Sequence, residues 1–174
     1  LGKAILSLAK REESRDVESN MIFIVSAFVS HWQEPLANIR EQMFRGYRSG
    51  LENGDVGNAF LNIYQYCRYC YSSGSQLSRV LADLETYRAQ LVENDFQILL
   101  GVSMGFLQMI KALMGKPNEL FTTSGETINE DDFLSRHNMR MGSSQWYFFK
   151  ANHLALAQYM GNFKLASQLL KETQ

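Results

Sequence analysis

The stretch that most constrains the fold is 35–73, PLANIREQMFRGYRSGLENGDVGNAFLNIYQYCRYCYSS, which has helical periodicity on both sides of Asn53-Gly54-Asp55. Apolar side chains recur at helical spacing before the turn (Leu36, Ile39, Met43, Phe44, Tyr47) and after it (Val56, Ala59, Phe60, Ile63, Cys67). Gly54 suits a helix C-terminus because it adopts the left-handed conformation without a Cβ penalty, and Asp55 suits the next N-cap. The stretch therefore predicts an antiparallel pair of helices.

The remaining chain repeats this pattern, so we expect an all-α protein with a single domain over 1–174. Further helices are expected at 1–10, 20–33, 77–91, 94–114, 130–139, 144–160 and 163–172. Expected N-caps are Ser75, Asn94 or Asp95, and Ser143 or Ser144, while His31 is interpreted as a C-terminal cap of the helix at 20–33. The charged segment 11–18 is expected to be a helix end or a connection, and 116–129 forms the longest connection.

Charge and composition narrow the classes of function. The chain has 17 Lys and Arg against 18 Asp and Glu, which argues against a nucleic-acid-binding surface. The longest apolar stretch, 21–29, is too short to span a bilayer, and no helix combines a large apolar face with a basic one. We expect a cytoplasmic location, with no membrane and no nucleic acid among the partners. The first residue is not Met, so we interpret the chain as a piece of a longer polypeptide.

No motif predicts catalysis, a cofactor or a metal. Cys67 and Cys70 form a C-x-x-C, but they lie mid-helix without a second cysteine pair, so we expect two small buried core residues rather than a zinc or redox site. Ser143, Ser144 and His153 are the candidate residues for a hydrolase, but no oxyanion-hole segment accompanies them. We therefore predict that the chain is not an enzyme.

An internal repeat is the most informative pattern. Gly54-Asp55-x-x-x-Ala59 and Gly161-Asn162-x-x-x-Ala166 each place a helix before the glycine and another after it. This resembles the joint between the two helices of a tetratricopeptide repeat (TPR), in which a small Ala lets the helices pack closely. No 34-residue period runs through the chain, so we expect a TPR-like α-solenoid of consecutive antiparallel helical hairpins.

A wider pattern covers about 20–174. Its residues are His31-Trp32-x-x-Pro35-Leu36, Gly46-Tyr47, Gly50-Leu51-Glu52-Asn53-Gly54-Asp55, Gly74-x-x-Leu77 and Leu84-x-x-Tyr87. This resembles the helical region that follows the ATPase module of very large STAND-type signalling proteins, ahead of GAF, histidine-kinase or cyclase-type domains. The resemblance implies a helical scaffold without catalytic residues of its own. The chain has no Walker A motif, so such an ATPase would lie outside it.

The repeat register predicts a partner-binding groove. The first helix of each hairpin would line it, here 35–53 and 144–160, with Glu41, Phe44, Arg45 and Arg48 toward the groove. Arg45 and Arg48 share one helix face, which suits a carboxylate or an acidic peptide. The alternative is a solvated face on which these arginines pair locally with Glu41 or Glu52.

Two further expectations concern other partners. A repeat segment exposes faces meant for neighbours, so we expect self-association, with helix 20–33 and the terminal helices as candidate faces. A second class of function is a small-molecule sensor with an aromatic pocket between helices, for which Tyr47, Tyr64, Trp146 and Phe149 are the candidate residues.

Overall fold

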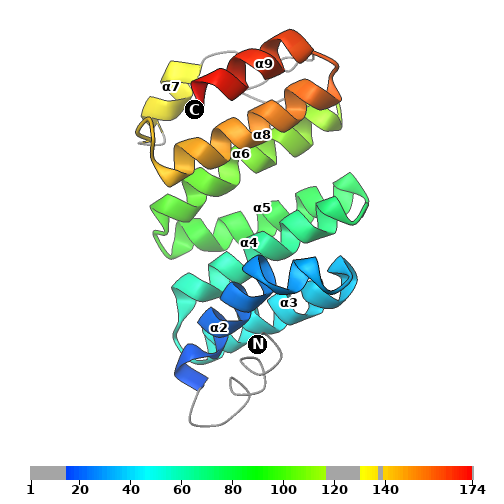
Figure 1. The fold of residues 1–174 in the computed structure, drawn as a ribbon. Coiled ribbons are helices and arrows are strands. Elements are labelled where there is room, and N and C mark those ends of the chain that lie inside the picture. The colour runs from blue at the N-terminus through cyan, green and yellow to red at the C-terminus, as the bar shows by residue number, and fades with distance from the viewer. Residues whose placement is uncertain (1–14, 117–129, 137–138, 174) are drawn as a thin grey trace. The chain divides into compact units, whose positions relative to one another are not determined.

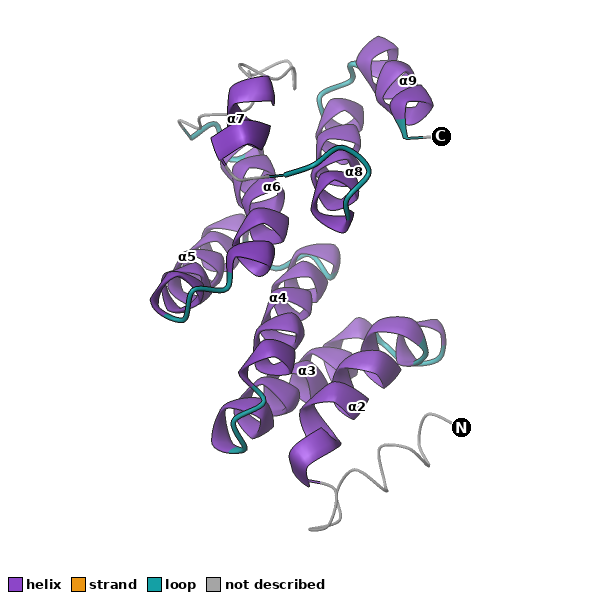
Figure 2. Cartoon of the chain, turned by 90° about the vertical axis from the view of Figure 1, so that its left-hand side faces the viewer, coloured by secondary structure: helices purple, strands orange, loops and turns teal. Residues whose placement is uncertain are grey.

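The computed structural model describes residues 15–116, 130–136 and 139–173, and these residues form helices joined by turns, without a strand (Figures 1 and 2). The all-α prediction is confirmed for this part of the chain. The expected helix at 1–10 and the connection from 117 to 129 lie outside the described residues. The helices are α2 (Arg15–Phe28), η2 (Ser30–Trp32, a 3₁₀ turn), α3 (Leu36–Glu52), α4 (Val56–Ser72), α5 (Leu77–Glu93), α6 (Gln97–Leu113), α7 (Glu130–Arg136), α8 (Ser144–Tyr159) and α9 (Phe163–Glu172).

The chain divides into two compact units, Leu1–Asp83 and Leu84–Gln174, with the boundary inside α5. In the first unit, α2, α3 and α4 contact one another. In the second, α8 contacts both α6 and α9. The prediction of a single domain stays a prediction.

The predicted boundaries of the second helix were wrong at both ends. Helix α2 is described from Arg15, inside the segment 11–18 that was expected to be a helix end or a connection, and it ends at Phe28. His31 lies in the separate turn η2 rather than at the end of α2, so it does not cap that helix.

Two of the predicted N-caps were also wrong. Helix α5 begins at Leu77, and the Ser75 hydroxyl instead accepts a hydrogen bond from Arg40 Nη1 at 3.1 Å. The N-cap of α6 is Phe96, because Asp95 adopts a positive φ of 57° and so forms the turn before the cap. Helix α7 is described over Glu130–Arg136, and Met139, where the expected helix ended, is not helical.

The two repeated joints have the same local geometry. Gly54 and Gly161 have φ values of 77° and 73°, in the left-handed region that glycine tolerates best. Asp55 accepts a hydrogen bond from the Asn58 backbone N–H, and Asn162 accepts one from that of Leu165. The following alanines, Ala59 and Ala166, are both buried. The Ser143 cap of α8 is confirmed as well, since its hydroxyl accepts from the Trp146 N–H.

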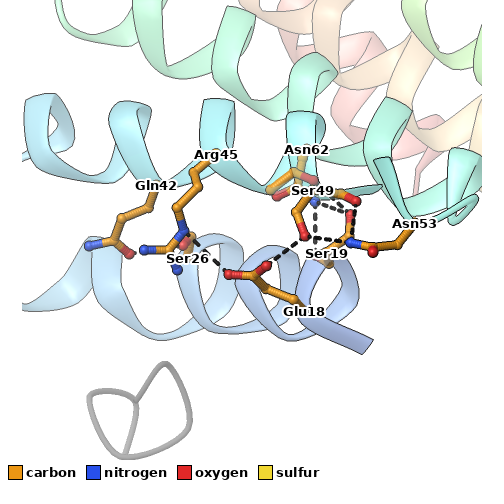
Figure 3. A network of polar contacts seen from close by, with 9 residues as sticks. Glu18, Ser19, Ser26, Gln42, Arg45, Ser49, Asn53 and Asn62 are labelled. Atoms are coloured by element: carbon orange, nitrogen blue, oxygen red, sulfur yellow. Dashed lines mark hydrogen bonds and ion pairs between the residues drawn. The ribbon is translucent and has the colours of Figure 1, made fainter. Parts of the chain in front are cut away.

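A buried polar contact joins the three helices of the first unit (Figure 3). The Asn62 side chain on α4 donates to the Ser19 carbonyl on α2 at 2.9 Å, and the Ser19 hydroxyl donates to the Gly46 carbonyl on α3 at 2.9 Å. A Cβ atom on Gly46 would lie 2.6 Å from Asn62 Oδ1, and one on Gly50 would lie 2.7 Å from Ser19 Oγ. The two glycines therefore let α2 and α4 approach the backbone of α3.

An apolar cluster joins the same three helices. Ile39 and Met43 of α3 are fully buried beside Tyr69 of α4, with Phe23 and Ala27 of α2 packed against them. The Tyr69 hydroxyl donates to the Ser26 carbonyl of α2 at 3.2 Å, so the aromatic residue contributes both apolar area and a polar link.

Two features hold the second unit together: the close approach of α6 to α8 and the buried cation of Lys150. A Cβ on Gly105 of α6 would lie 3.2 Å from the Phe149 Cα of α8, so this glycine allows the two helices to pack closely. Lys150, 5% exposed, contacts Glu130 of α7 at 2.6 Å and Glu172 of α9 at 2.8 Å. Burial alone would lower the pKa of Lys150, but hydrogen bonds to the two carboxylates outweigh it and raise that pKa.

We predict that Gly46→Ala destabilises the first unit. Ala favours a helix by about 1 kcal/mol over Gly, but overpacking costs roughly 1–3 kcal/mol, and the new methyl displaces the Asn62 amide. The net loss should be up to about 2 kcal/mol, measured by urea unfolding followed by circular dichroism. In an Asn62→Ala background the same change should cost much less. Equal costs in both backgrounds would contradict the predicted clash.

We also predict a pH-dependent role for Glu172. The hydrogen bond from Lys150 is the main cause that holds the pKa of Glu172 below its ordinary value. A lowered folded-state pKa stabilises the protein above the unfolded-state pKa, and this stabilisation is lost as the pH falls through the folded value. Glu172→Gln should therefore lower Tm at neutral pH, and the difference should vanish in acid. The exposed Glu93→Gln is the matched control, and a Tm difference independent of pH would argue against the ion pair.

Candidate binding surface on α3

The four residues predicted to face a groove do lie on one surface. Glu41, Phe44, Arg45 and Arg48 line an open hollow of about 670 Å³ beside α3, which we call the α3 groove. Its other lining residues are Glu18, Glu34, Asn38, Gln42, Ser49 and Glu52. The prediction that a partner binds here stays a prediction, but its residues share a concave surface of the first unit.

Helical spacing explains why these residues come together. Asn38, Glu41, Arg45, Arg48 and Glu52 are separated alternately by three and four residues, so they form one stripe along α3. Glu34 continues this spacing just before the helix begins. The sequence-based prediction missed Glu34 and placed Glu52 only as a local partner, although the same spacing indicates both.

Arg45 is already engaged by a carboxylate of α2. Its Nε lies 3.6 Å from Glu18 Oε1, while the Ser49 hydroxyl donates to Glu18 Oε2 at 2.6 Å (Figure 3). The expected local partners of Arg45 were Glu41 or Glu52, but the carboxylate at ion-pair distance belongs to Glu18. The sequence analysis missed Glu18 because its segment was interpreted as a helix end or a connection, and its position depends on how α2 packs against α3.

Phe44 adds an apolar contact surface to the α3 groove. Its side chain is 39% exposed, and its ring centroid lies 6.1 Å from that of Tyr47 and 5.8 Å from that of Tyr66. Phe44 and Glu41 also line a second hollow of about 330 Å³ with Arg40 and Arg79. The Phe44 ring therefore contacts two other aromatic rings and is partly exposed to solvent.

The residues of the alternative aromatic pocket lie in different units. Tyr47 and Tyr64 belong to the first unit, and Trp146 and Phe149 belong to the second. Tyr47 and Phe149 are core residues, 8% and 0% exposed. Trp146 lines a hollow of about 460 Å³ in the second unit, together with Lys150, Glu130 and Glu172.

The cysteine pair is part of the core, as the sequence predicts. Cys67 and Cys70 are free thiols with 1% and 5% exposure. Burial is the main cause that raises the pKa of Cys67, and the nearby Asp83 carboxylate raises it further. Burial and a hydrogen bond with Cys70 raise the pKa of Tyr66 to about 12. A protonated, buried thiol is a poor nucleophile and a poor metal ligand.

The serine and histidine candidates do not form a catalytic pair. Ser143 caps α8, and His153 lies on the same helix ten residues later, about 15 Å along the axis. The His153 ring is buried beside Phe149, with a centroid distance of 6.1 Å. Among the described residues, no three His, Cys, Asp or Glu side chains are placed to hold a metal ion.

Comparison with known proteins leaves the family of the chain open. No family model matches the chain, and no curated protein or solved structure is significantly similar to it. Of the helices in the described part of the chain, none has the length and apolar character needed to cross a membrane.

Proposed function

We propose that the chain is a non-catalytic protein-interaction module that binds a protein or peptide segment in the α3 groove. The observation that carries this proposal is the shared concave surface of Glu41, Phe44, Arg45 and Arg48, four residues selected from the repeat register alone. Helix-lined concave surfaces are the usual binding faces of repeat proteins.

The architecture we propose is a TPR-like α-solenoid segment. Its support is the pair of joints at Gly54 and Gly161, which share a positive φ, a side-chain N-cap and a buried alanine. The resemblance to the helical region of STAND-type signalling proteins places the chain, in this proposal, in a cytoplasmic multidomain protein as a scaffold or sensor. Neighbouring domains of the same polypeptide are then candidate partners.

A small-molecule sensor is the alternative function. The observation that favours it is the hollow beside Trp146 in the second unit, where an aromatic ring lies among the charged groups of Lys150, Glu130 and Glu172. In this alternative, a metabolite would raise the melting temperature of the protein by binding the folded state.

Removal of the two groove arginines tests the proposed binding surface. Arg45→Ala with Arg48→Ala should weaken capture of partners in a pull-down, because both side chains line the groove. The melting temperature should change little, since a partly exposed ion pair such as Arg45–Glu18 contributes only about 0–1 kcal/mol. Lys164→Ala with Lys171→Ala on α9 removes the same charge from another surface and is the control. If the wild type and both variants capture the same proteins, the α3 groove is excluded as the binding surface.

Self-association is a separate part of the proposal. An apolar stripe on α2 and η2 is exposed, with Val17 at 43%, Ile24 at 48%, Phe28 at 64% and Trp32 at 81%. Large exposed apolar patches mark interaction surfaces. We predict concentration-dependent association in light scattering, and Ile24→Glu with Phe28→Glu should reduce it because charged groups resist burial. A wild-type chain that stays monomeric at high concentration would count against this prediction.

A further inference from the structure

Helix α2 carries apolar side chains on two opposite faces. Ile22 and Val25 lie on the face that packs against α3 and α4, where they are 0% and 1% exposed. The apolar residues of the opposite face are separated by four, three and four positions, which is the spacing of the seam between two paired helices. They are Val17, Met21, Ile24 and Phe28, which we call the α2 stripe. A helix that is apolar all round is normally buried on all sides, so the stripe indicates a second packing partner.

The exposed area of this face suits the centre of a dimer interface. Phe28 is 64% exposed, and Trp32, in the turn η2 just after α2, is 81% exposed. A covered aromatic side chain buries 150–250 Å² or so, which means that these two rings leave roughly 300 Å² available in each copy. The rings of two copies would therefore bury roughly 600 Å², half of the ~1,200 Å² at the lower end of stable interfaces, and the aliphatic residues of the α2 stripe add to this area.

The chemistry of this face suits a second copy of the same chain. A symmetric dimer brings the same surface of both copies together, so a charged face would meet its own charge. No Asp, Glu, Lys or Arg occurs between positions 19 and 33. Glu18, just before this segment, is held by Arg45 and Ser49 of α3 (Figure 3). Helix α2 can therefore pair with its own copy without bringing like charges together.

The exposed apolar face of α9 is a poorer partner for the α2 stripe. Phe163 and Leu170 are 72% and 51% exposed there, but Ser167 lies between them along the helix. Lys164 and Lys171 are exposed one position after each apolar residue. A contact between α2 and α9 would leave these ammonium groups beside a segment that has no carboxylate, and covering an unpaired charge is costly.

An antiparallel arrangement of two α2 helices gives the better fit. It places Val17 opposite Phe28 of the second copy, and Met21 opposite Ile24, so that a large side chain faces a smaller one at the ends of the seam. It also opposes the two helix dipoles. A parallel pair would align the dipoles and would set the two Phe28 rings against each other.

From this spacing, exposure and lack of charge we infer that the α2 stripe pairs antiparallel with the α2 stripe of a second copy and closes a symmetric dimer. This inference rests on the self-association proposed above. It goes further because it names the face, the orientation of the helices and the limit of two copies.

Sedimentation equilibrium of the full chain tests the limit of two copies. A symmetric interface of this kind is used up in the dimer, so the mass should level off at twice the 20.0 kDa of one chain as the concentration rises. A mass that keeps rising would indicate a head-to-tail contact, which overturns the inference and leaves self-association intact. A chain that stays monomeric overturns both.

Disulfide cross-linking tests the face and the orientation. Val17→Cys and Phe28→Cys are made as separate chains, one of them ¹⁵N-labelled so that its mass identifies mixed dimers, and are oxidised mildly alone and together. The mixture should give about tenfold more cross-linked dimer than either variant alone, because a disulfide needs Cα atoms within about 7 Å. In the antiparallel pair the two copies of position 17 lie about 16 Å apart along the axis. The native thiols, Cys67 and Cys70, are 1% and 5% exposed, so the wild type serves as the background.

Ile98→Cys on α6, at a position 65% exposed, is the matched control and should not cross-link with Val17→Cys. Met21→Cys mixed with Ile24→Cys repeats the test near the centre of the seam, in case loss of the Phe28 ring weakens the dimer. Self-cross-linking of Val17→Cys and of Phe28→Cys would show a parallel pair, and a wild-type dimer without any cross-link at these positions would place the interface elsewhere. If the wild type is monomeric and a maleimide reacts more slowly with Ile24→Cys than with Ile98→Cys, another part of the chain covers the stripe. Each of these three results overturns the inference.

Discussion

The first unit depends on the contact of the Asn62 side chain with Ser19 across the glycine face of α3. This amide donates to the Ser19 carbonyl and also to the Asn58 carbonyl, so one side chain ties α4 to α2 and to its own preceding turn. Buried polar groups are costly when unpaired, which makes such a contact selective for one arrangement of the helices. The absence of a Cβ on Gly46 is what allows the amide to reach this position.

The candidate binding surface follows from this packing. Ser19 and Glu18 are adjacent, so the contact that fixes Ser19 against Asn62 also brings Glu18 to Arg45 and Ser49. Helix α2 thereby supplies one side of the α3 groove and neutralises one of its arginines. The charge pattern of this surface therefore depends in part on a buried hydrogen bond.

Local signals in the sequence predicted the helices, the turns at Gly54 and Gly161, and the stripe that carries Arg45, because each depends on residues close along the chain. Features that depend on distant contacts were not predictable in the same way. The position of Glu18 depends on how α2 packs against α3. The N-cap of α6 was predicted at the wrong residue because Asp95 adopts the left-handed conformation in the preceding turn. The sequence alone allowed Asp95 to be the N-cap.

Hydrogen exchange of α2 in Asn62→Ala tests this dependence most directly. The backbone amides of Ile22 and Val25 lie on the buried side of α2, so their exchange reports how firmly α2 is held on α3 and α4. We predict that Asn62→Ala accelerates their exchange more than that of the α6 amides in the second unit, and that the signals of Arg45 shift as Glu18 is released. Unchanged exchange in α2 would show that apolar packing alone positions this helix, and would contradict the role assigned to Asn62.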